Sequence, residues 1–236
     1  DTRVFGVLQR IALCYCVASL AIHYLKLRGA LVFGALALLA HWLILASFGD
    51  LTMQGNAGTR FDLWLLGASH LYHGEGVPFD PEGLLGTLPA TANVIGGYAA
   101  GVYLQRKGPT WMTIVRMLIA SIALMLLAVW WDFALPINKK LWTGSYVLLT
   151  VGACLCILSW LVAVIDIGGR VRWTRFFVVF GHNALFIYVF SELLLVVLMM
   201  VPAGDGSLYH WTYVHGFQSW AGDRNGSALF AAAFML

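Results

Sequence analysis

Long apolar stretches alternate with polar connections along the whole chain. A helix needs about 20 mostly apolar residues to cross the core of a bilayer, and we interpret six stretches as such spans. They cover residues 11–25, 30–48, 84–104, 111–131, 141–165 and 176–201. A seventh, truncated span begins near Ser227. Because apolar residues surround each stretch instead of following one face, membrane spans are favoured over amphipathic helices.

The pattern therefore predicts an all-α fold, a polytopic transmembrane helix bundle that forms a single domain over residues 1–236. Composition supports this reading, since 61% of the residues are hydrophobic and 11% are charged. A soluble domain has about 45–50% apolar and about 25% charged residues. A soluble enzyme is thus excluded. The net charge of +3 is too small to indicate nucleic-acid binding. The expected partner is the lipid bilayer.

The connections between the spans differ in charge. The short connections 26–29, 105–110 and 166–175 are basic, and the positive-inside rule places them in the cytoplasm. The longer connections and the N-terminal residues would face the other side. They carry nine acidic residues: Asp1, Asp50, Asp62, Glu75, Asp80, Glu82, Asp132, Asp205 and Asp223.

The outer loop 49–83 is too long to be a mere connection, and its residues 61–72 could form a short interfacial helix. Within thirteen residues it gathers histidines and carboxylates, namely His70, His73, Glu75, Asp80 and Glu82. Such a group could bind a metal or serve in acid–base chemistry. The alternative, which we favour for Asp80, is a helix cap followed by Pro81 at the first helical position. No metal is expected.

Polar residues also lie at the ends of spans and within them. Asn138, Lys139 and Lys140 at the outer mouth of the fifth span could bind a substrate or act as interfacial anchors, and both readings stay open. Arg10, near the start of the first span, could anchor it or bind an anion. The lone histidines His23 and His41 are expected to be buried and hydrogen-bonded.

The sixth span contains an ionisable residue, Glu192, and an amide, Asn183. Ionisable residues inside a span are costly and usually functional. Gly181, Leu185, Tyr188 and Glu192 would share one helical stripe that faces the bundle. The alternative is a hydrogen bond that only joins two helices.

Four segments in a fixed order resemble the heparan-alpha-glucosaminide N-acetyltransferase family, and most of all its bacterial relatives. They cover residues 3–15, 79–90, 137–147 and 181–188. The resemblance implies a polytopic enzyme of the bacterial inner membrane. It would take acetyl from cytoplasmic acetyl-CoA and pass it to an amino sugar on the far side. A homodimer is left open.

The resemblance also implies roles for particular side chains. Polar residues of the outer loops would contact the amino sugar: Asp80, Glu82, Asn138 and Lys139. Basic residues of the inner loops would hold the phosphates of CoA: Arg106, Lys107, Arg116, Arg170, Arg172 and Arg175. Residues within the bundle would join the two faces: Asn93, Asn183 and Glu192.

The proposed catalytic histidine of this family lies in a His-x-x-Trp-Asn-Gly motif that the sequence does not contain. Because the sequence begins with Asp1 and ends within an apolar stretch, we expect an internal piece of a longer chain that lacks this motif. The catalytic residue therefore cannot be named here. The alternative function is an amino-sugar transporter or permease, since transporters also use glycine-rich helices and polar residues at mid-membrane.

Overall fold

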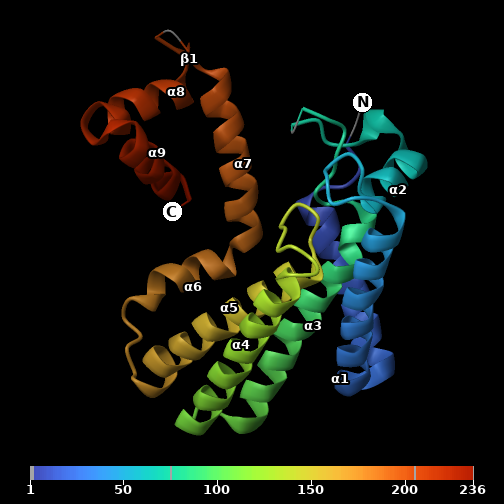
Figure 1. The fold of residues 1–236 in the computed structure, drawn as a ribbon. Coiled ribbons are helices and arrows are strands. Elements are labelled where there is room, and N and C mark those ends of the chain that lie inside the picture. Colours follow the sequence, from blue (N-terminus) through green and yellow to red (C-terminus); the bar gives the residue numbers. More distant parts are fainter. Residues whose placement is uncertain (1–2, 75, 205, 236) are drawn as a thin grey trace. The chain divides into compact units, whose positions relative to one another are not determined.

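A computed structural model describes residues 3–74, 76–204 and 206–235 of the chain. Three acidic residues of the sequence analysis, Asp1, Glu75 and Asp205, lie outside this part. The chain divides after Arg170 into two compact units, which Figure 1 shows and which are described separately below. The single domain expected over residues 1–236 stays a prediction.

The first unit is built from helices, and the long ones run between its two opposite ends. They are α1 (Val7–Phe48), α2 (Ala57–Leu66), the 3-10 helix η1 (Ala68–His70), α3 (Leu84–Lys107), α4 (Trp111–Asp132), α5 (Gly144–Val162) and the π-helical η2 (Ala163–Ile167). Helix α1 joins two helices that meet in a kink at Lys26. The halves of α1 correspond to the predicted spans 11–25 and 30–48. The predicted helix at 61–72 corresponds to α2 and η1 together, of which α2 begins four residues earlier than predicted, at Ala57.

Three helices of the described chain are long and apolar enough to cross a membrane: α1, α4, and α5 extended by η2. A fourth span is added if a bent helix pair of the second unit counts as one. The all-α prediction is confirmed, and these helices support an integral membrane protein. The predicted count of six complete spans and a seventh is not confirmed. Helix α3 is not among the three, since threonine, asparagine and glycine interrupt its apolar residues.

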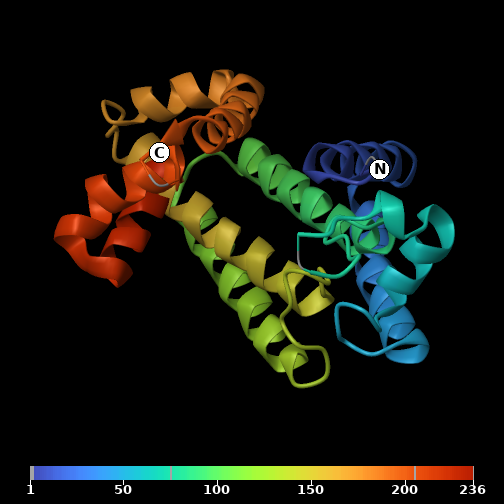
Figure 2. The ribbon, with the colours of Figure 1, turned by 90° about the horizontal axis from the view of Figure 1, so that it is seen from above.

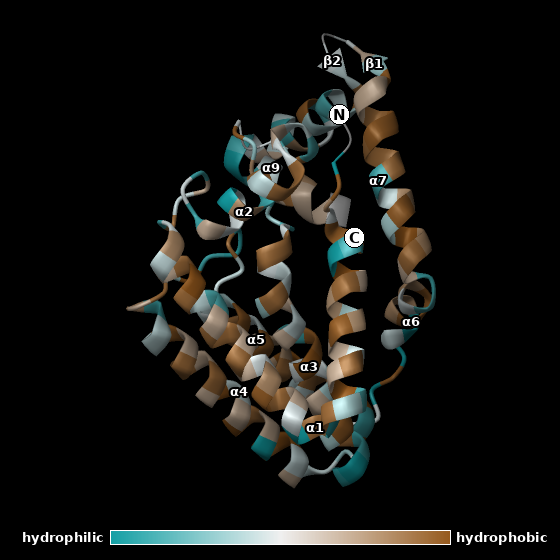
Figure 3. Cartoon of the chain, turned by 90° about the vertical axis from the view of Figure 1, so that its right-hand side faces the viewer, coloured by the Kyte–Doolittle hydropathy of each residue, from teal (hydrophilic) through white to brown (hydrophobic). Residues whose placement is uncertain are grey.

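Side chains of the candidate spans point outward in large numbers, as lipid-facing residues do. On α4, Ile119, Leu126 and Trp130 are 62%, 65% and 71% exposed. Figure 3 shows hydrophobic residues along the lengths of α4 and α5. Exposed apolar surface of this extent marks a membrane or protein interaction surface.

Small residues bring the helices of the first unit close together. Ala18 and Ala30 of α1 are fully buried in one cluster with Ile95 of α3. Ser121 of α4 donates a 2.8 Å hydrogen bond to the carbonyl oxygen of Gly152 on α5. Close approach of this kind stabilises helix pairs in membranes, where burial of apolar surface adds little. Figure 2 shows α4 packed along α5.

The second unit is also helical, apart from a small hairpin. Its elements are α6 (Thr174–His182), α7 (Ala184–Met200), the antiparallel strands β1 (Pro202–Ala203) and β2 (Gly206–Ser207), α8 (Leu208–Tyr213), the π-helical η3 (Val214–Gln218) and α9 (Ser219–Met235). Helix α9 begins before Ser227, where the truncated span was predicted, and it is kinked at Gly222.

The predicted span 176–201 is not one continuous helix. Helices α6 and α7 meet at 84°, because Asn183 leaves helical geometry with φ −118° and ψ 28°. The Asn183 side chain donates a 2.9 Å hydrogen bond to the Val179 carbonyl oxygen near the end of α6. The predicted stripe is therefore wrong as a single helical face, since Gly181 belongs to α6 and Glu192 to α7.

Candidate functional site

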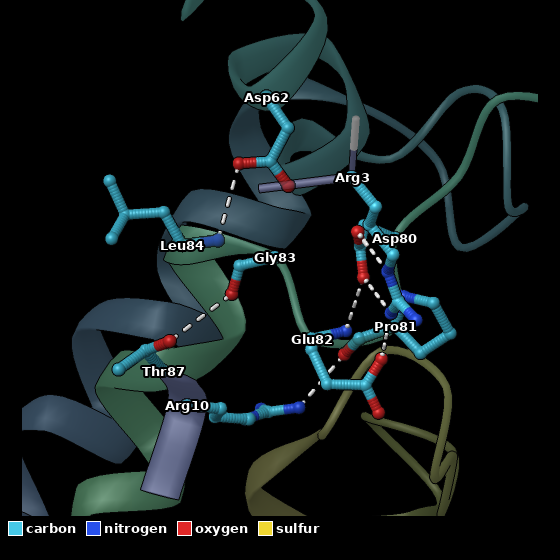
Figure 4. Close-up of polar contacts among 9 residues, drawn as sticks. All are labelled: Arg3, Arg10, Asp62, Asp80, Pro81, Glu82, Gly83, Leu84 and Thr87. Carbon is cyan, nitrogen blue, oxygen red and sulfur yellow. Dashed lines mark hydrogen bonds and ion pairs between the residues drawn. The ribbon is translucent and has the colours of Figure 1, made fainter. Parts of the chain in front are cut away.

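Two of the segments that carry the family resemblance are joined by an ion pair at one end of the first unit. Arg3 binds both carboxylate oxygens of Asp80, at 3.0 and 2.7 Å, and also contacts Glu82 (Figure 4). The guanidinium group lies 4.6 Å from the ring centre of Tyr72. Hydrogen bonding to Asp80 raises the pKa of Arg3. Bidentate pairs of this kind fix orientation as well as charge.

Arg10 connects three of these segments. It is only 5% exposed. One terminal nitrogen donates a 2.8 Å hydrogen bond to the Pro81 carbonyl oxygen, and the other donates to that of Gly86. Its guanidinium lies 4.1 Å from the ring centre of Trp142, in the third segment. Two of its donors thus bind carbonyl oxygens of the fold, which supports an anchoring role, and anion binding by this residue stays a prediction.

Asp62 of α2 contacts the start of α3, a role that the sequence did not predict. It is 2% exposed, and one carboxylate oxygen accepts a 3.2 Å hydrogen bond from the backbone N–H of Leu84, the first residue of α3. A negative charge there is favoured by the helix dipole. Burial nevertheless raises the pKa of Asp62 to about 6. The only sequence signal is an acidic residue within a predicted interfacial helix.

The capping role favoured for Asp80 is wrong. Helix α3 begins at Leu84 and its N-cap is Gly83, so Asp80 and Pro81 precede the helix. Asp80 instead closes a turn, accepting a 3.1 Å hydrogen bond from the Glu82 backbone N–H. A Cβ atom at Gly83 would overlap the Asp62 carboxylate, which explains why glycine suits this position.

A second polar chain links the third segment to the middle of the bundle. The indole N–H of Trp142 donates a 3.0 Å hydrogen bond to the Asn93 side-chain oxygen, and the Asn93 amide donates a 3.1 Å bond to the Thr150 hydroxyl. Trp142 holds a left-handed backbone with φ 52°, which is uncommon for a bulky residue. Asn93 of α3 thus links α3 to Trp142 and to Thr150 of α5, and its part in a polar path through the bundle stays a prediction.

The residues predicted to contact an amino sugar lie in two neighbouring loops. Asp80 and Glu82 are already paired with Arg3. The Asn138 side-chain oxygen accepts hydrogen bonds of 2.8 and 3.2 Å from the N–H groups of Lys140 and Leu141, so it shapes its own loop. Lys139 is exposed. Their roles toward a substrate stay predictions.

The histidines of the outer loop do not form a metal centre with the residues that the structure describes. No group of three His, Cys, Asp or Glu side chains in that part of the chain could hold an ion. The His70 carbonyl oxygen accepts a 3.3 Å hydrogen bond from the Val4 N–H, which ties the loop to the first segment. His73 is exposed. Glu75 of this group lies outside the described residues.

A cavity of about 820 Å³ lies between α1, α3, α4 and α5. Its walls are mainly apolar, and Asn93, Thr150, Tyr103 and Arg116 are among the polar residues that line it. Ligand pockets commonly have volumes of about 300–1,000 Å³, with apolar walls and a few polar groups. The dimensions therefore suit a small organic ligand.

Of the basic residues predicted to bind CoA, Arg116 lines this cavity. Arg106 and Lys107 are exposed at the end of α3, one short turn before α4 begins. Arg170 is the last residue of the first unit, whereas Arg172 and Arg175 belong to the second. Four of the six thus belong to the first unit, and Arg106 and Lys107 are adjacent at the end of α3.

The candidate polar residues of the second unit are solvent-accessible within that unit. Glu192 on α7 is exposed, as are His182 and Asn183 at the junction of α6 and α7. Their place within a bundle stays a prediction.

Comparison with known proteins gives partial matches. No family model matches the chain. Human heparan-alpha-glucosaminide N-acetyltransferase is 34% identical over 155 residues, which cover 58% of this chain and 23% of the relative. The mouse protein of the same name is 35% identical over 159 residues, covering 59% and 24%. The predicted family resemblance is confirmed as a partial match. The chain matches about a quarter of the length of these curated relatives.

Proposed function

We propose that the chain forms part of a membrane-embedded acetyltransferase of the bacterial inner membrane. Acetyl would pass from acetyl-CoA, bound at the cytoplasmic side, to an amino sugar on the opposite side. The observation that carries this proposal is the similarity to two N-acetyltransferases. The interlocked segments around Arg10 support it, because segments of the family resemblance that are far apart in sequence meet at one place.

The large cavity is the proposed site of the acyl donor. Its apolar walls suit the uncharged arm of an acyl thioester. Arg116 lines it, and Arg106 and Lys107 at the same end would bind phosphate groups. Under the proposed topology, loops 26–29, 105–110 and 166–175 are cytoplasmic. Arg170, Arg172 and Arg175 would add positive charge on that side.

The acceptor amine would bind at the opposite end, near Asp80, Glu82, Asn138 and Lys139. In the reaction the amine nitrogen attacks the thioester carbon, the carbon–sulfur bond breaks, and the amine gives up a proton to a base. Hydrogen-bond donors must stabilise the oxyanion that forms in between. No catalytic residue is assigned to this chain. Asn93, Asn183 and Glu192 are the candidates for a polar path between the two ends, and a homodimer stays a prediction.

A transporter for amino sugars is the second candidate. The observation that favours it is the 84° break between α6 and α7 at Asn183, because transporters build substrate sites from interrupted helices. The cavity beside the glycine-rich α3 would also suit a permeation path.

Sealed vesicles that contain the full-length protein distinguish the two functions. Acetyl-CoA with a labelled acetyl group is supplied on one side, and glucosamine with a different label is supplied on the other. Label in N-acetylglucosamine on the acceptor side supports the acetyltransferase. Labelled glucosamine that crosses unmodified, without acetyl transfer, supports the transporter and contradicts the enzyme.

A further inference from the structure

A second, much smaller cavity lies at the end of the first unit where the segments interlock. Its volume is about 20 Å³. Space of about 10–15 Å³ holds one water molecule, provided that two to four polar groups surround it. Six polar side chains are among the lining residues: His41, Asn56, Thr59, Asp62, Asp80 and Lys140. The cavity is therefore both polar enough and large enough for water.

Three of these side chains have their hydrogen bonds made within the protein. The Asn56 amide donates to the Thr52 and Met53 carbonyl oxygens, and its oxygen accepts from the Thr59 N–H. The Thr59 hydroxyl donates to the Met53 carbonyl oxygen at 2.7 Å. Asp80 is held by Arg3.

His41 and Asp62 can each form one more hydrogen bond. His41 is 1% exposed, and its Nδ1 atom has no hydrogen-bond partner among the described residues. Asp62 uses one oxygen for the Leu84 N–H, and its other oxygen lies against Gly83 (Figure 4). A buried polar atom without a partner costs about 1–3 kcal/mol. A bridging molecule between these two groups would remove that cost.

We propose that the small cavity binds one water molecule, and that His41, this water and Asp62 together form a unit that takes up one proton. The water would bond to the imidazole on one side and to the carboxyl group on the other. Lowering the pH adds a proton from solvent to the unit, and raising the pH releases it. The proposal concerns proton binding and does not depend on the acetyltransferase function.

The charges around the unit support a single proton. Asp80, on the loop before α3, adds a negative charge that favours protonation of Asp62, although Arg3 offsets it. Glu82 on the same loop also contacts Arg3. Arg10 of α1, which donates to the Gly86 carbonyl oxygen, and Lys140, which lines the cavity, bring positive charge to this end of the first unit. Burial raises the pKa of Asp62 to about 6, so the proton exchanges near neutral pH.

Infrared spectroscopy of the intact protein in nanodiscs tests the proposal. The stretching band of a protonated carboxyl group is followed between pH 4 and 8 in the wild type, Asp62→Asn and Asp50→Asn. Asp50 is the matched control, since it is an exposed aspartate whose pKa is lowered by hydrogen bonds from Thr52. We expect a band that titrates near pH 6 in the wild type and in Asp50→Asn and is missing in Asp62→Asn. A band that persists in Asp62→Asn overturns the proposal.

The link to His41 is tested by His41→Asn and His41→Phe, with His23→Phe on the same helix as the exposed control. We expect both His41 variants to shift the midpoint of the Asp62 band, with a smaller shift for asparagine, and His23→Phe to leave it unchanged. Unchanged midpoints in both His41 variants contradict the water link. If neither variant folds, nitrogen-15 NMR of wild-type His41 decides. A signal that changes in Asp62→Asn supports the link, and one that does not overturns it.

Discussion

A few buried polar residues hold the end of the first unit where the family segments meet, and Arg10 contacts two of the other segments there. It binds two carbonyl oxygens of the segment that enters α3 and stacks on Trp142. Hydrogen bonds to charged groups stabilise by about 1.5–3 kcal/mol, and desolvated cation–π contacts add about 2 kcal/mol. The side chain therefore acts as a structural connector.

Arg10→Gln should lower the free energy of unfolding by about 2–4 kcal/mol, because both carbonyl oxygens lose a charged donor. Thermal unfolding in detergent measures the change. Arg60→Gln is the control, since exposed Arg60 makes one 3.3 Å bond to the Phe48 carbonyl oxygen. Its effect should be within about 0.5 kcal/mol. Equal effects of the two substitutions would contradict the connector role.

Asp62 should give stability a distinct pH dependence. Its pKa is about 6 in the folded protein and near 3.8 in the unfolded chain, so the folded state binds the proton more tightly. This contribution to the free energy of unfolding is complete below about pH 4 and is lost as the pH rises through about 6.

Denaturation at a series of pH values checks this sign. Relative to Asp62→Asn, the wild type should lose stability between about pH 4 and 6 and show a constant difference above about pH 7. Asp50→Asn should show the opposite sign at lower pH, because hydrogen bonds from Thr52 lower the Asp50 pKa. A pH-independent difference for Asp62→Asn would show that this carboxyl group titrates normally.

At the scale of single residues, the sequence predicted which segments carry the site better than it predicted the contacts of their side chains. The segments at 3–15, 79–90 and 137–147 do meet in space. The role of Asp62 was missed because its partner, Leu84, is 22 residues away and is reached only through the tertiary fold. His41 is buried as expected, but within the described part of the chain its Nδ1 atom has no hydrogen-bond partner, and His23 is exposed.

At the scale of the elements, two helix breaks change the direction of the chain: one at Lys26 within α1, and one at Asn183 between α6 and α7. Lys26 adopts φ 59° and ψ 178° between the halves of α1. This backbone region is essentially restricted to glycine and costs a residue with a side chain about 1–3 kcal/mol. Periodicity placed a break near this point, since two spans were predicted on either side. It could not predict the break at Asn183, because no proline marks it and apolar residues continue beyond it.

Lys26→Gly should raise the free energy of unfolding by about 1 kcal/mol by relieving that backbone strain. Thermal or denaturant unfolding in detergent reports the change. The control is Arg28→Gly two residues later, which lies within helical structure and should be destabilising by about 1 kcal/mol. Destabilisation by both glycines would refute the strained turn.

Helix α3 offers a test of the large cavity. Gly97 lines the cavity and Gly101 does not, and a Cβ atom at either position would meet nothing within 4 Å. Gly97→Trp should fill the space and lower kcat/KM for acetyl transfer by the intact protein about tenfold or more. Gly101→Trp and Gly97→Ala should change it less than about twofold. Equal losses of kcat/KM for Gly97→Trp and Gly101→Trp would show that the cavity has no part in the reaction.

At the scale of the whole molecule, the first unit separates two kinds of connection. In Figure 1 the kink of α1 and the turn between α3 and α4 lie at one end, and the loop that contains α2 lies at the other. The basic connections 26–29 and 105–110 therefore share an end, as charge distribution predicted. Such alternation follows from helices that traverse a common thickness.

Cysteine labelling tests the proposed orientation. In sealed cells, an impermeant maleimide should label Lys139→Cys but not Lys107→Cys, because the former lies in an outer loop under the positive-inside rule. After permeabilisation both should react, since both positions are exposed. Labelling of Lys107→Cys alone before permeabilisation would reverse the orientation.

The contacts of Arg10 can form only in a fixed order while the chain is being synthesised. Its first carbonyl partner is made 71 residues later, at Pro81, and Trp142 follows 61 residues after Pro81. At about 5–20 residues per second, the arginine waits roughly ten seconds before its surroundings are complete. Until the third segment has been made, the Arg10 side chain of α1 therefore lacks part of these contacts.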